Sequence, residues 1–369
     1  MRRSSVDGWS RSRSLAGIAG ALLVFAVALT ACSPTSSTNG DPFPGSLLTK
    51  TACAANEAAG TITYVSPFGY DASAGIIDVL AARKLGYFDQ MCLNTAFVMN
   101  SEDSASLVSS GRATTTSTGS AADFLVSVAD GSNIVAVATY GDTSDYCIIT
   151  RKGLSSLAAL EGHTLGYHFV QEAPDLEMLS AAGVKIAKIQ MIDTPDYDPN
   201  QIIQGKLDAV DCYQSNEPLT LRAEGAQFNE FTPSEYGVSG TYNVQFFNAN
   251  FLKQHYTAAE DWMRATLHGF AYCVAHEAEC VSIEQQYAQA KGADFVVSHE
   301  KQVWQLESAL STGHTLPGAG VGVQSYSEWQ PEANEVAKFH LVKAVPSLQT
   351  CENVTMTSSL YNGKTLVWP

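Results

Sequence analysis

The sequence predicts an α/β fold with two lobes, in which each lobe is a mostly parallel sheet flanked by helices. Three observations predict this class. Short β-rich runs alternate with amphipathic helical stretches from Thr61 onward, the alternation repeats once, and after Asn243 the chain becomes mainly helical. Alternating strands and helices form open sheets that helices cover on both faces. The helical C-terminal part is expected to return to the first lobe.

The first cycle of strands and helices covers residues 61 to 139. Its first strand ends in a Pro-Phe-Gly turn at 67–69, and an apolar helical stripe over 76–81 is closed by Gly86. Short β-branched runs indicate strands, whereas apolar residues three and four apart indicate helices. We expect strands at 62–66, 93–98, 113–117 and 134–139, with further helices at 104–110 and 121–128.

The second cycle is entered and left by two β-rich segments, 146–151 and 242–247, which we expect to cross between the lobes as a hinge. Within it we expect strands at 164–167, 186–192 and 207–212, a helix at 175–182 and a helical turn at 201–204. Beyond it, Met263, Leu267, Phe270 and Val274 share one helical face, and helices are expected at 283–290, 301–309 and 328–342. Residues 60–145 and 243–369 would form the first lobe, and 146–242 the second.

The N-terminus predicts export. Four arginines precede an apolar run from Leu15 to Leu29, which is too short for a comfortable membrane span and is typical of a signal peptide. The segment Leu29-Thr30-Ala31-Cys32 resembles the bacterial lipobox, in which Cys32 is lipidated; ordinary cleavage near Ala31 is the alternative. We therefore expect a signal peptide at 1–31, a flexible tether at 32–59 and a lipid-anchored, extracytoplasmic protein.

Composition excludes several classes of function. The chain carries a formal charge of −16, and removal of the signal, which has four arginines against one aspartate, leaves about −16 − 3 = −19. This charge argues against nucleic-acid binding and against electrostatic attachment to a membrane. No second apolar run has membrane length, so a receptor or an enzyme is expected rather than a permease. We expect a monomer.

Motifs for cofactors and metals are incomplete. The glycine-rich segment 318–322 lacks the spacing of a dinucleotide fingerprint, and the acidic residues at 193, 196 and 198 lack the other ligands of an EF-hand. We predict no cofactor and no metal.

The cysteines predict disulfides, since an exported protein meets an oxidising compartment. Of the eight cysteines, seven follow Cys32, so at least one thiol remains unpaired or pairs with another molecule. The best pair is Cys273 with Cys280, and Cys53 with Cys92 would pin the tether to the second strand. A zinc-site fragment at 273–280 is the alternative to the first pair.

Several motifs together resemble one family. They are Gly86-Tyr87-Phe88, the segments 156–166 and 205–210, Tyr213-Gln214-Ser215-Asn216-Glu217-Pro218, and 234–238. In this order they resemble the ABC-transporter solute receptors of the sulfonate, nitrate and thiamine-pyrimidine-precursor group. The chain departs from the usual pattern at Ala159, where aspartate is usual, and at 112–114, which lacks an acidic residue.

The resemblance implies a type II periplasmic-binding-protein-like fold that closes on a small molecule and presents it to an ABC permease and its ATPase. The ligand would be a pyrimidine or flavin precursor, or a sulfonate- or nitrate-type anion, and the protein would not be an enzyme. Two alternatives remain: a thiamine-pyrimidine-synthesising enzyme of the same fold, and an extracellular sensor or interaction lipoprotein.

Candidate ligand residues follow the predicted strands, because ligands of open α/β sheets lie beyond the carboxyl ends of the strands. Tyr70 could stack on a flat ring and Asp71 could accept a hydrogen bond from a ring amine, or Asp71 could simply cap the next helix. Gly119 and Ser120 offer backbone N–H groups and a hydroxyl at a helix start, although capping alone is the plainer interpretation of Ser120.

The second lobe supplies the other candidates. Tyr167 could form half of a stacking clamp or belong to the lobe core. Asn216 and Glu217 could bind the polar edge of a heterocycle, or could instead begin a capped helix near residue 218. Tyr236 and Tyr242, near the second crossing, complete the set.

Overall fold

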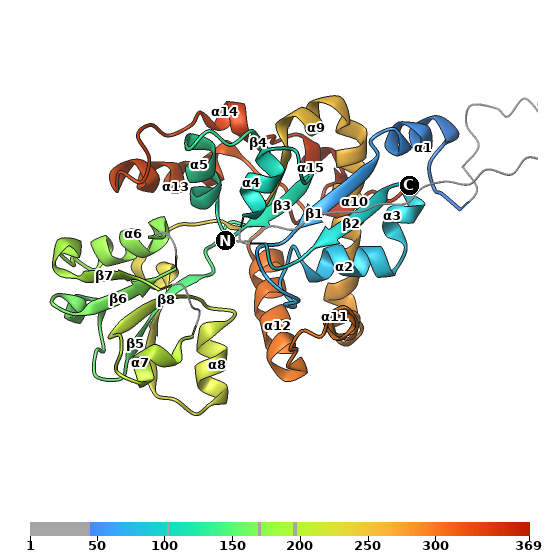
Figure 1. Ribbon diagram of the computed structural model, residues 1–369. Coiled ribbons are helices and arrows are strands. Elements are labelled where there is room, and N and C mark those ends of the chain that lie inside the picture. Colours follow the sequence, from blue (N-terminus) through green and yellow to red (C-terminus); the bar gives the residue numbers. More distant parts are fainter. Residues whose placement is uncertain (1–44, 102, 169–170, 195–197) are drawn as a thin grey trace, which may run out of the picture. The chain divides into compact units, whose positions relative to one another are not determined.

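Two five-stranded sheets with the same strand order form the framework of the fold (Figure 1). The computed structural model describes residues 45–101, 103–168, 171–194 and 198–369, which all belong to one compact unit. The signal peptide, Cys32 and Asp196 lie outside the described residues.

The first sheet has the order β2-β1-β3-β10-β4. Its strands are β1 (Thr61–Val65), β2 (Asn94–Val98), β3 (Thr115–Thr118), β4 (Ile134–Gly141) and β10 (Tyr242–Asn248). Strand β1 pairs in parallel with β2 and β3, whereas β10 is antiparallel to both β3 and β4. The strand that arrives last along the chain is therefore inserted in reverse direction between two earlier ones.

The second sheet repeats this arrangement with the order β7-β6-β8-β5-β9. Its strands are β5 (Tyr146–Arg151), β6 (Thr164–Tyr167), β7 (Gln190–Asp193), β8 (Ala209–Tyr213) and β9 (Phe228–Phe231). Here the reversed strand is β5, which is antiparallel to β8 and β9. In both sheets the reversed strand is the one that follows a crossing between lobes, so the amino ends of β5 and β10 lie beside the carboxyl ends of their neighbours.

Helices cover both faces of each sheet. With the first sheet lie α1 (Lys50–Glu57), α2 (Ile77–Lys84), α3 (Tyr87–Gln90), α4 (Ser104–Ser109), α5 (Ala121–Ala129), α9 (Ala249–Gln254), α10 (Tyr256–Ala275), α11 (Glu277–Lys291), α12 (Val297–Gly313), α13 (Tyr326–Lys338), α14 (Leu348–Cys351), α15 (Met356–Ser359) and the short strands β11 (Tyr361–Asn362) and β12 (Thr365–Leu366). With the second lie α6 (Ala173–Ala181), α7 (Asn200–Ile203), α8 (Glu217–Ala223) and the 3₁₀ turns η1 (Leu157–Leu160), η2 (Ile186–Lys188) and η3 (Pro233–Tyr236).

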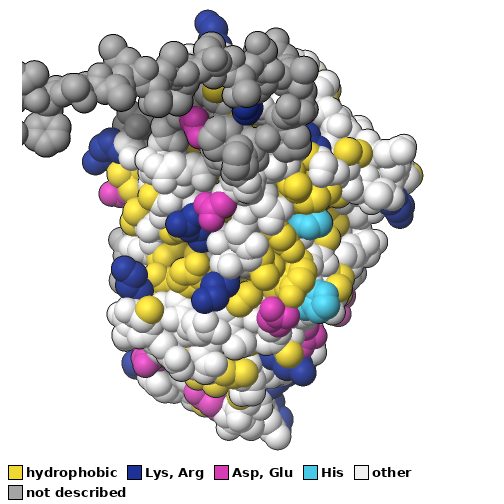
Figure 2. Space-filling model, turned by 90° about the vertical axis from the view of Figure 1, so that its right-hand side faces the viewer, with side chains coloured by type: hydrophobic (Ala, Val, Ile, Leu, Met, Phe, Trp, Pro, Cys, Tyr) yellow, Lys and Arg dark blue, Asp and Glu magenta, His cyan; other side chains and the backbone are white. Residues whose placement is uncertain are grey.

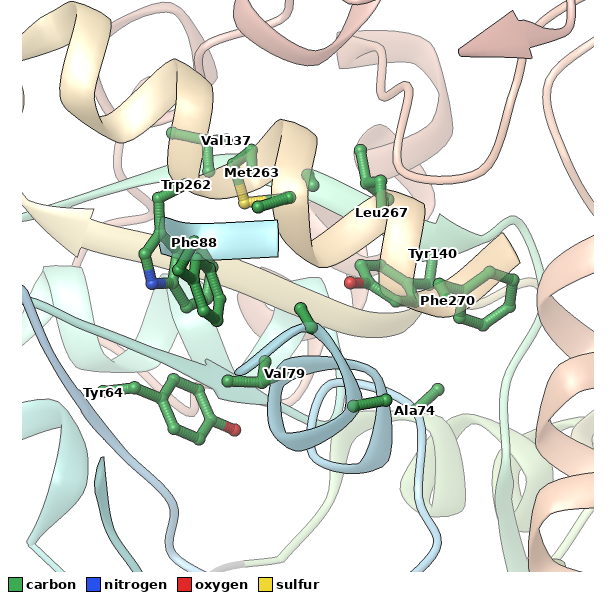
Figure 3. Packing of buried hydrophobic residues seen from close by; sticks show 14 of the residues in the cluster. Tyr64, Ala74, Val79, Phe88, Val137, Tyr140, Trp262, Met263, Leu267 and Phe270 are labelled. Atoms are coloured by element: carbon green, nitrogen blue, oxygen red, sulfur yellow. The ribbon is translucent and has the colours of Figure 1, made fainter. Parts of the chain in front are cut away.

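Side-chain alternation along the strands explains the two-faced packing. Phe247 packs in the cluster with α2 and α10, whereas its neighbour Phe246 packs in the cluster with α5 and α13. In the first cluster the fully buried Trp262 of α10 lies beside Phe88 and near Tyr64 (Figure 3), with ring centroids 5.8 Å and 6.0 Å away. Burial of such large rings is the main stabilising contribution of this face.

Three disulfides join the described cysteines, which confirms the predicted pair Cys273–Cys280 and the pair Cys53–Cys92. A third bond, which the sequence did not indicate, joins Cys147 to Cys212 across the paired strands β5 and β8. Cys351 is free and buried.

Three expectations need correction. The range 32–59 is not all tether, because α1 begins at Lys50 with Thr49 as its N-cap and Cys53 ties it to the chain after α3. The strand expected at 186–192 is η2 followed by the shorter β7. Val274 is 46 % exposed, so the apolar face of α10 ends at Cys273.

On the face shown in Figure 2, acidic and basic side chains are interspersed with hydrophobic ones rather than separated into patches of one sign. Among the described residues, no helix is both long enough and apolar enough to cross a membrane.

Candidate ligand-binding cleft

Two adjoining cavities lie where the ends of strands from both sheets meet. The first encloses about 80 Å³ and the second, a wider groove, about 1330 Å³. They share the lining residues Phe68, Ser117, Thr118, Gly119 and Tyr213. Because the first holds only a small chemical group and opens beside a roomy groove, the two together form one cleft with a narrow, polar end.

The narrow end is lined by the ends of strands and by one face of α12. Its polar and aromatic lining consists of Phe68, Asp71, Ser73, Ser117, Thr118, Asp145, Tyr213, Ser215, Asn216, Tyr242, Asn243, His299, Glu300 and Glu307. The reversed direction of β5 and β10 brings Asp145, Tyr242 and Asn243 to this end, since they stand at the amino ends of those strands.

Three aromatic rings separate the narrow end from the groove. Tyr213, at the end of β8, lies edge-on to Phe68 with centroids 6.2 Å apart, and its ring centroid is 5.0 Å from that of Tyr146. The Tyr146 hydroxyl donates a 2.7 Å hydrogen bond to Asp123 Oδ2. A β-carbon at Gly119 would lie 2.6 Å from the Tyr146 hydroxyl, so only glycine lets the rings approach this loop.

Asp145 has an unpaired carboxylate oxygen in the wall of the narrow end. Ser215 Oγ donates a 2.6 Å hydrogen bond to Asp145 Oδ2, but Oδ1 has no partner although the residue is only 3 % exposed. Burial raises the pKa of Asp145 well above its ordinary value, and the nearby Glu307 charge raises it further. Buried polar atoms are normally hydrogen-bonded, so an orphaned oxygen in a cavity marks a place for a ligand donor.

Asn243 presents an unpaired donor to the same end. Its backbone N–H donates to Gly119 O at 2.9 Å, its φ is +49°, and its side-chain Nδ2 has no partner at 5 % exposure. A non-glycine residue in the left-handed region carries local strain, which concentrates at binding sites.

Two carboxylates of α12 hold the loop that precedes α2. Ala72 N–H donates to Glu300 Oε2 at 2.8 Å, while Ser73 Oγ and Ala74 N–H donate to Glu307 Oε2 at 2.8 Å and 2.6 Å. The Tyr242 hydroxyl also donates to Glu307. Burial raises the pKa of Glu300 to about 7 and that of Glu307 to about 6, so both sit close to titration near neutral pH.

The structure brings five of the residues that sequence analysis singled out to the cleft. Asp71, Gly119, Asn216 and Tyr242 line the narrow end, and Tyr167 lines the groove. Asp71 does not cap α2, whose N-cap is Ile76. Asn216 Oδ1 lies 3.1 Å from His299 Nε2, which links α8 to α12 across the cleft.

The other four stand outside the lining of both cavities. Tyr70 is half-buried beside them, and Tyr236 packs on Phe231 within the second lobe. Ser120 is the N-cap of α5, where it forms a capping box with Asp123. Glu217 Oε2 accepts a 2.9 Å hydrogen bond from Tyr213 N–H, which fixes the turn between β8 and α8.

The family is now defined by comparison. The model of the "NMT1/THI5 like" family matches residues 73–280, more than half of the chain. The chain belongs to the NMT1/THI5-like family. The matched range contains both reversed strands and ends within α11, so this family member carries α12, with Glu300 and Glu307, beyond the matched part.

Solved structures are similar in fold. The ligand-binding component of an ABC-type import system from Staphylococcus aureus has a TM-score of 0.61 at 16% identity, over 80% of this chain and 97% of that chain. The aliphatic sulphonate binding protein SsuA from Escherichia coli has a TM-score of 0.59 at 13% identity, over 79% of this chain and 96% of that chain. The desulfurization enzyme DSZB has a TM-score of 0.54 at 10% identity, over 81% of this chain and 98% of that chain. No protein of curated function is significantly similar in sequence.

Proposed function

We propose that this protein is the extracytoplasmic solute-binding component of an ABC importer. It captures a small aromatic or heterocyclic nutrient in the cleft between its lobes and delivers it to a membrane permease that an ATPase drives. The observation that carries this proposal is the narrow end of the cleft, where Asp145 Oδ1 and Asn243 Nδ2 are buried without partners beside a cluster of rings.

The geometry supports binding by closure around the ligand. The rings of Phe68 and Tyr213 come from different lobes and offer flat apolar surfaces, while the unpaired donor and acceptor offer complementary polar contacts. Two crossing segments between the lobes are the type of connection through which such receptors open and close. Solute-binding proteins among the similar structures support the same interpretation.

An enzyme of the same fold is the second candidate, because the desulfurization enzyme shares the architecture. The two functions separate on one measurement. A receptor returns its ligand unchanged after binding, whereas an enzyme converts it, and mass spectrometry of the ligand before and after incubation distinguishes them.

The direct test is native mass spectrometry of the mature protein, followed by thermal melting with pyrimidines, flavins, sulfonates and aromatic acids. A bound ligand adds RT ln(1 + [L]/Kd) to the free energy of unfolding and thereby raises the melting temperature. We expect one class to produce a saturable shift without turnover. Failure of every class to shift the melting temperature would contradict the proposal.

The proposed lipid anchor has a separate test. Cys32→Ser should move the protein from the membrane fraction to the soluble extracytoplasmic fraction, since one cysteine carries the acyl chains in a lipoprotein. An unchanged distribution would contradict lipidation at Cys32 but would leave the binding function intact.

A further inference from the structure

We propose that the ligand of this cleft is a small organic cation, such as an amidinium or a protonated amine, whose charged group enters the narrow end and bonds to Asp145. This inference rests on the proposed binding function and narrows its ligand class. Sulfonates and nitrate, which are anions, would then be excluded.

The first argument is the charge of the lining. The narrow end contains Asp71, Asp145, Glu300 and Glu307, and none of the described residues that line either cavity is a lysine or an arginine. The groove adds Asp103, Asp123, Asp130 and Glu172. An anion would meet carboxylates on several sides without a fixed cation to offset them, whereas a cation would relieve their mutual repulsion.

The second argument is independent of the charge. Glu300 and Glu307 accept hydrogen bonds from the loop 72–74, so their role is to hold that loop. They do not by themselves indicate a ligand site. Asp145 Oδ1 is different, because it is buried in the cavity wall and accepts no hydrogen bond from the protein. The charged group therefore supplies an N–H donor for Asp145, while Asn243 Nδ2, which is likewise unpaired, calls for an acceptor on another part of the ligand.

The third argument is the position of the rings. Phe68 and Tyr213 line both cavities, at the boundary between the narrow end and the groove. A cation within about 6 Å of a ring face gains further stabilisation from the π electrons. The small volume of the narrow end, about 80 Å³, fits a charged group rather than a whole heterocycle, whose ring would lie against Phe68 and Tyr213.

The test uses three compounds of one shape and different charge: benzamidine, benzamide and benzoate. Calorimetry with the full mature protein should show benzamidine binding at least about tenfold tighter than benzamide, a difference of about 1.4 kcal/mol, with no binding of benzoate. Asp145→Asn keeps an oxygen for Ser215 and should abolish the preference for benzamidine. Asp294→Asn, an exposed control outside both cavities, should preserve it.

Thermal melting of the free Asp145→Asn variant distinguishes a role in ligand binding from a purely structural role of Asp145. If Asp145 serves a ligand, Asp145→Asn should leave the melting temperature of the free protein unchanged or raise it, because it removes a buried carboxyl whose ionisation burial disfavours. A marked fall would mean that Asp145 is structural and would overturn the inference.

Two further outcomes separate this inference from the proposed function. The cation proposal is wrong if benzoate binds more tightly than benzamidine, or if a nutrient binds while benzamidine does not bind at millimolar concentration. Either result leaves the proposed receptor function intact. Absence of binding by every compound contradicts both.

Discussion

Gly240 lies directly against Ser144, so that a β-carbon on Gly240 would be only 2.7 Å from Cβ of Ser144. Ser144 stands between β4 and β5, and Gly240 stands between η3 and β10. The two connections between the lobes are therefore in contact, with the backbone of Gly240 against the side chain of Ser144. Any rotation of one lobe against the other has to pass through this contact.

Gly240→Ala should separate the two connections and weaken both stability and ligand binding. Carbon atoms do not approach to 2.7 Å, so the backbone must shift, at a cost of roughly 1–3 kcal/mol typical of overpacking. Thermal melting and calorimetry measure the two effects. Adding Ser144→Gly should recover most of the loss, and no recovery would show that the strain lies elsewhere.

Gly119→Ala should reduce ligand affinity more than stability. The new methyl would collide with the hydroxyls of Tyr146 and Tyr213, at 2.6 Å and 3.1 Å, and would displace the two rings that line the cleft. The matched control is Gly313→Ala, since a β-carbon there meets nothing within 4 Å. Equal effects of the two substitutions on binding would refute the role of the rings.

The stability that Asp78, Glu217 and Glu332 contribute to the free protein should fall as the pH rises from about 4 to about 7 and should level off above that range. Burial raises the pKa of Asp78 to about 7, of Glu332 to about 7 and of Glu217 to about 7. Each folded carboxyl therefore binds a proton more tightly than the unfolded chain does. Its contribution is fully present below the unfolded pKa and is lost as the pH rises through 7, on the order of 1 kcal/mol per pH unit and group.

Asp78→Asn tests how much Asp78 contributes to the fall of stability with pH. Asp78 Oδ2 accepts a 2.7 Å hydrogen bond from the Tyr140 hydroxyl, and asparagine can keep that contact by donating instead. Burial raises the pKa of the neighbouring Glu284, and the Asp78 charge raises it further, so the substitution also removes that smaller contribution. Melting curves at several pH values should show a shallower fall for Asp78→Asn, and an unchanged slope would exclude Asp78 as a contributor.

Removal of the Cys147–Cys212 disulfide should cost more stability than removal of Cys273–Cys280. The first closes a sequence separation of 65 residues and the second one of 7. In the chain-entropy model the losses are about 4 and about 2.5 kcal/mol. Denaturant unfolding of the paired Cys→Ala variants compares them, and the reverse order would show that strand packing outweighs chain entropy here.

Much of the fold was predictable because its signals are local. The strand expected at 134–139 falls within β4, and the one expected at 164–167 coincides with β6, whereas 146–151, expected as a crossing, is strand β5 inside the second sheet. Helix α1 was missed since its short alanine-rich sequence follows a Ser/Thr-rich stretch, and its order also depends on the disulfide to Cys92. Long-range contacts of this kind leave no periodic pattern.

The site was predictable only in part, for a topological reason. The rule that ligands lie beyond the carboxyl ends of strands identifies Asp71, Gly119 and Asn216, which line the narrow end. The same rule misses Asp145 and Asn243, because these residues stand at the amino ends of the strands that run in reverse. The other missed signal is Glu300 and Glu307, seven residues apart on one helix face, whose partners lie more than 200 positions earlier in the chain.

The insertion of β10 between β3 and β4 has a consequence for how the chain is made. The first sheet cannot close its hydrogen-bond ladder until residue 248 is available, although β4 already ends at residue 141. A polypeptide that leaves the ribosome or threads a translocation channel N-terminus first therefore carries a split, uncompleted sheet through most of its passage. The topology therefore makes completion of the first sheet a late event in the synthesis of the chain.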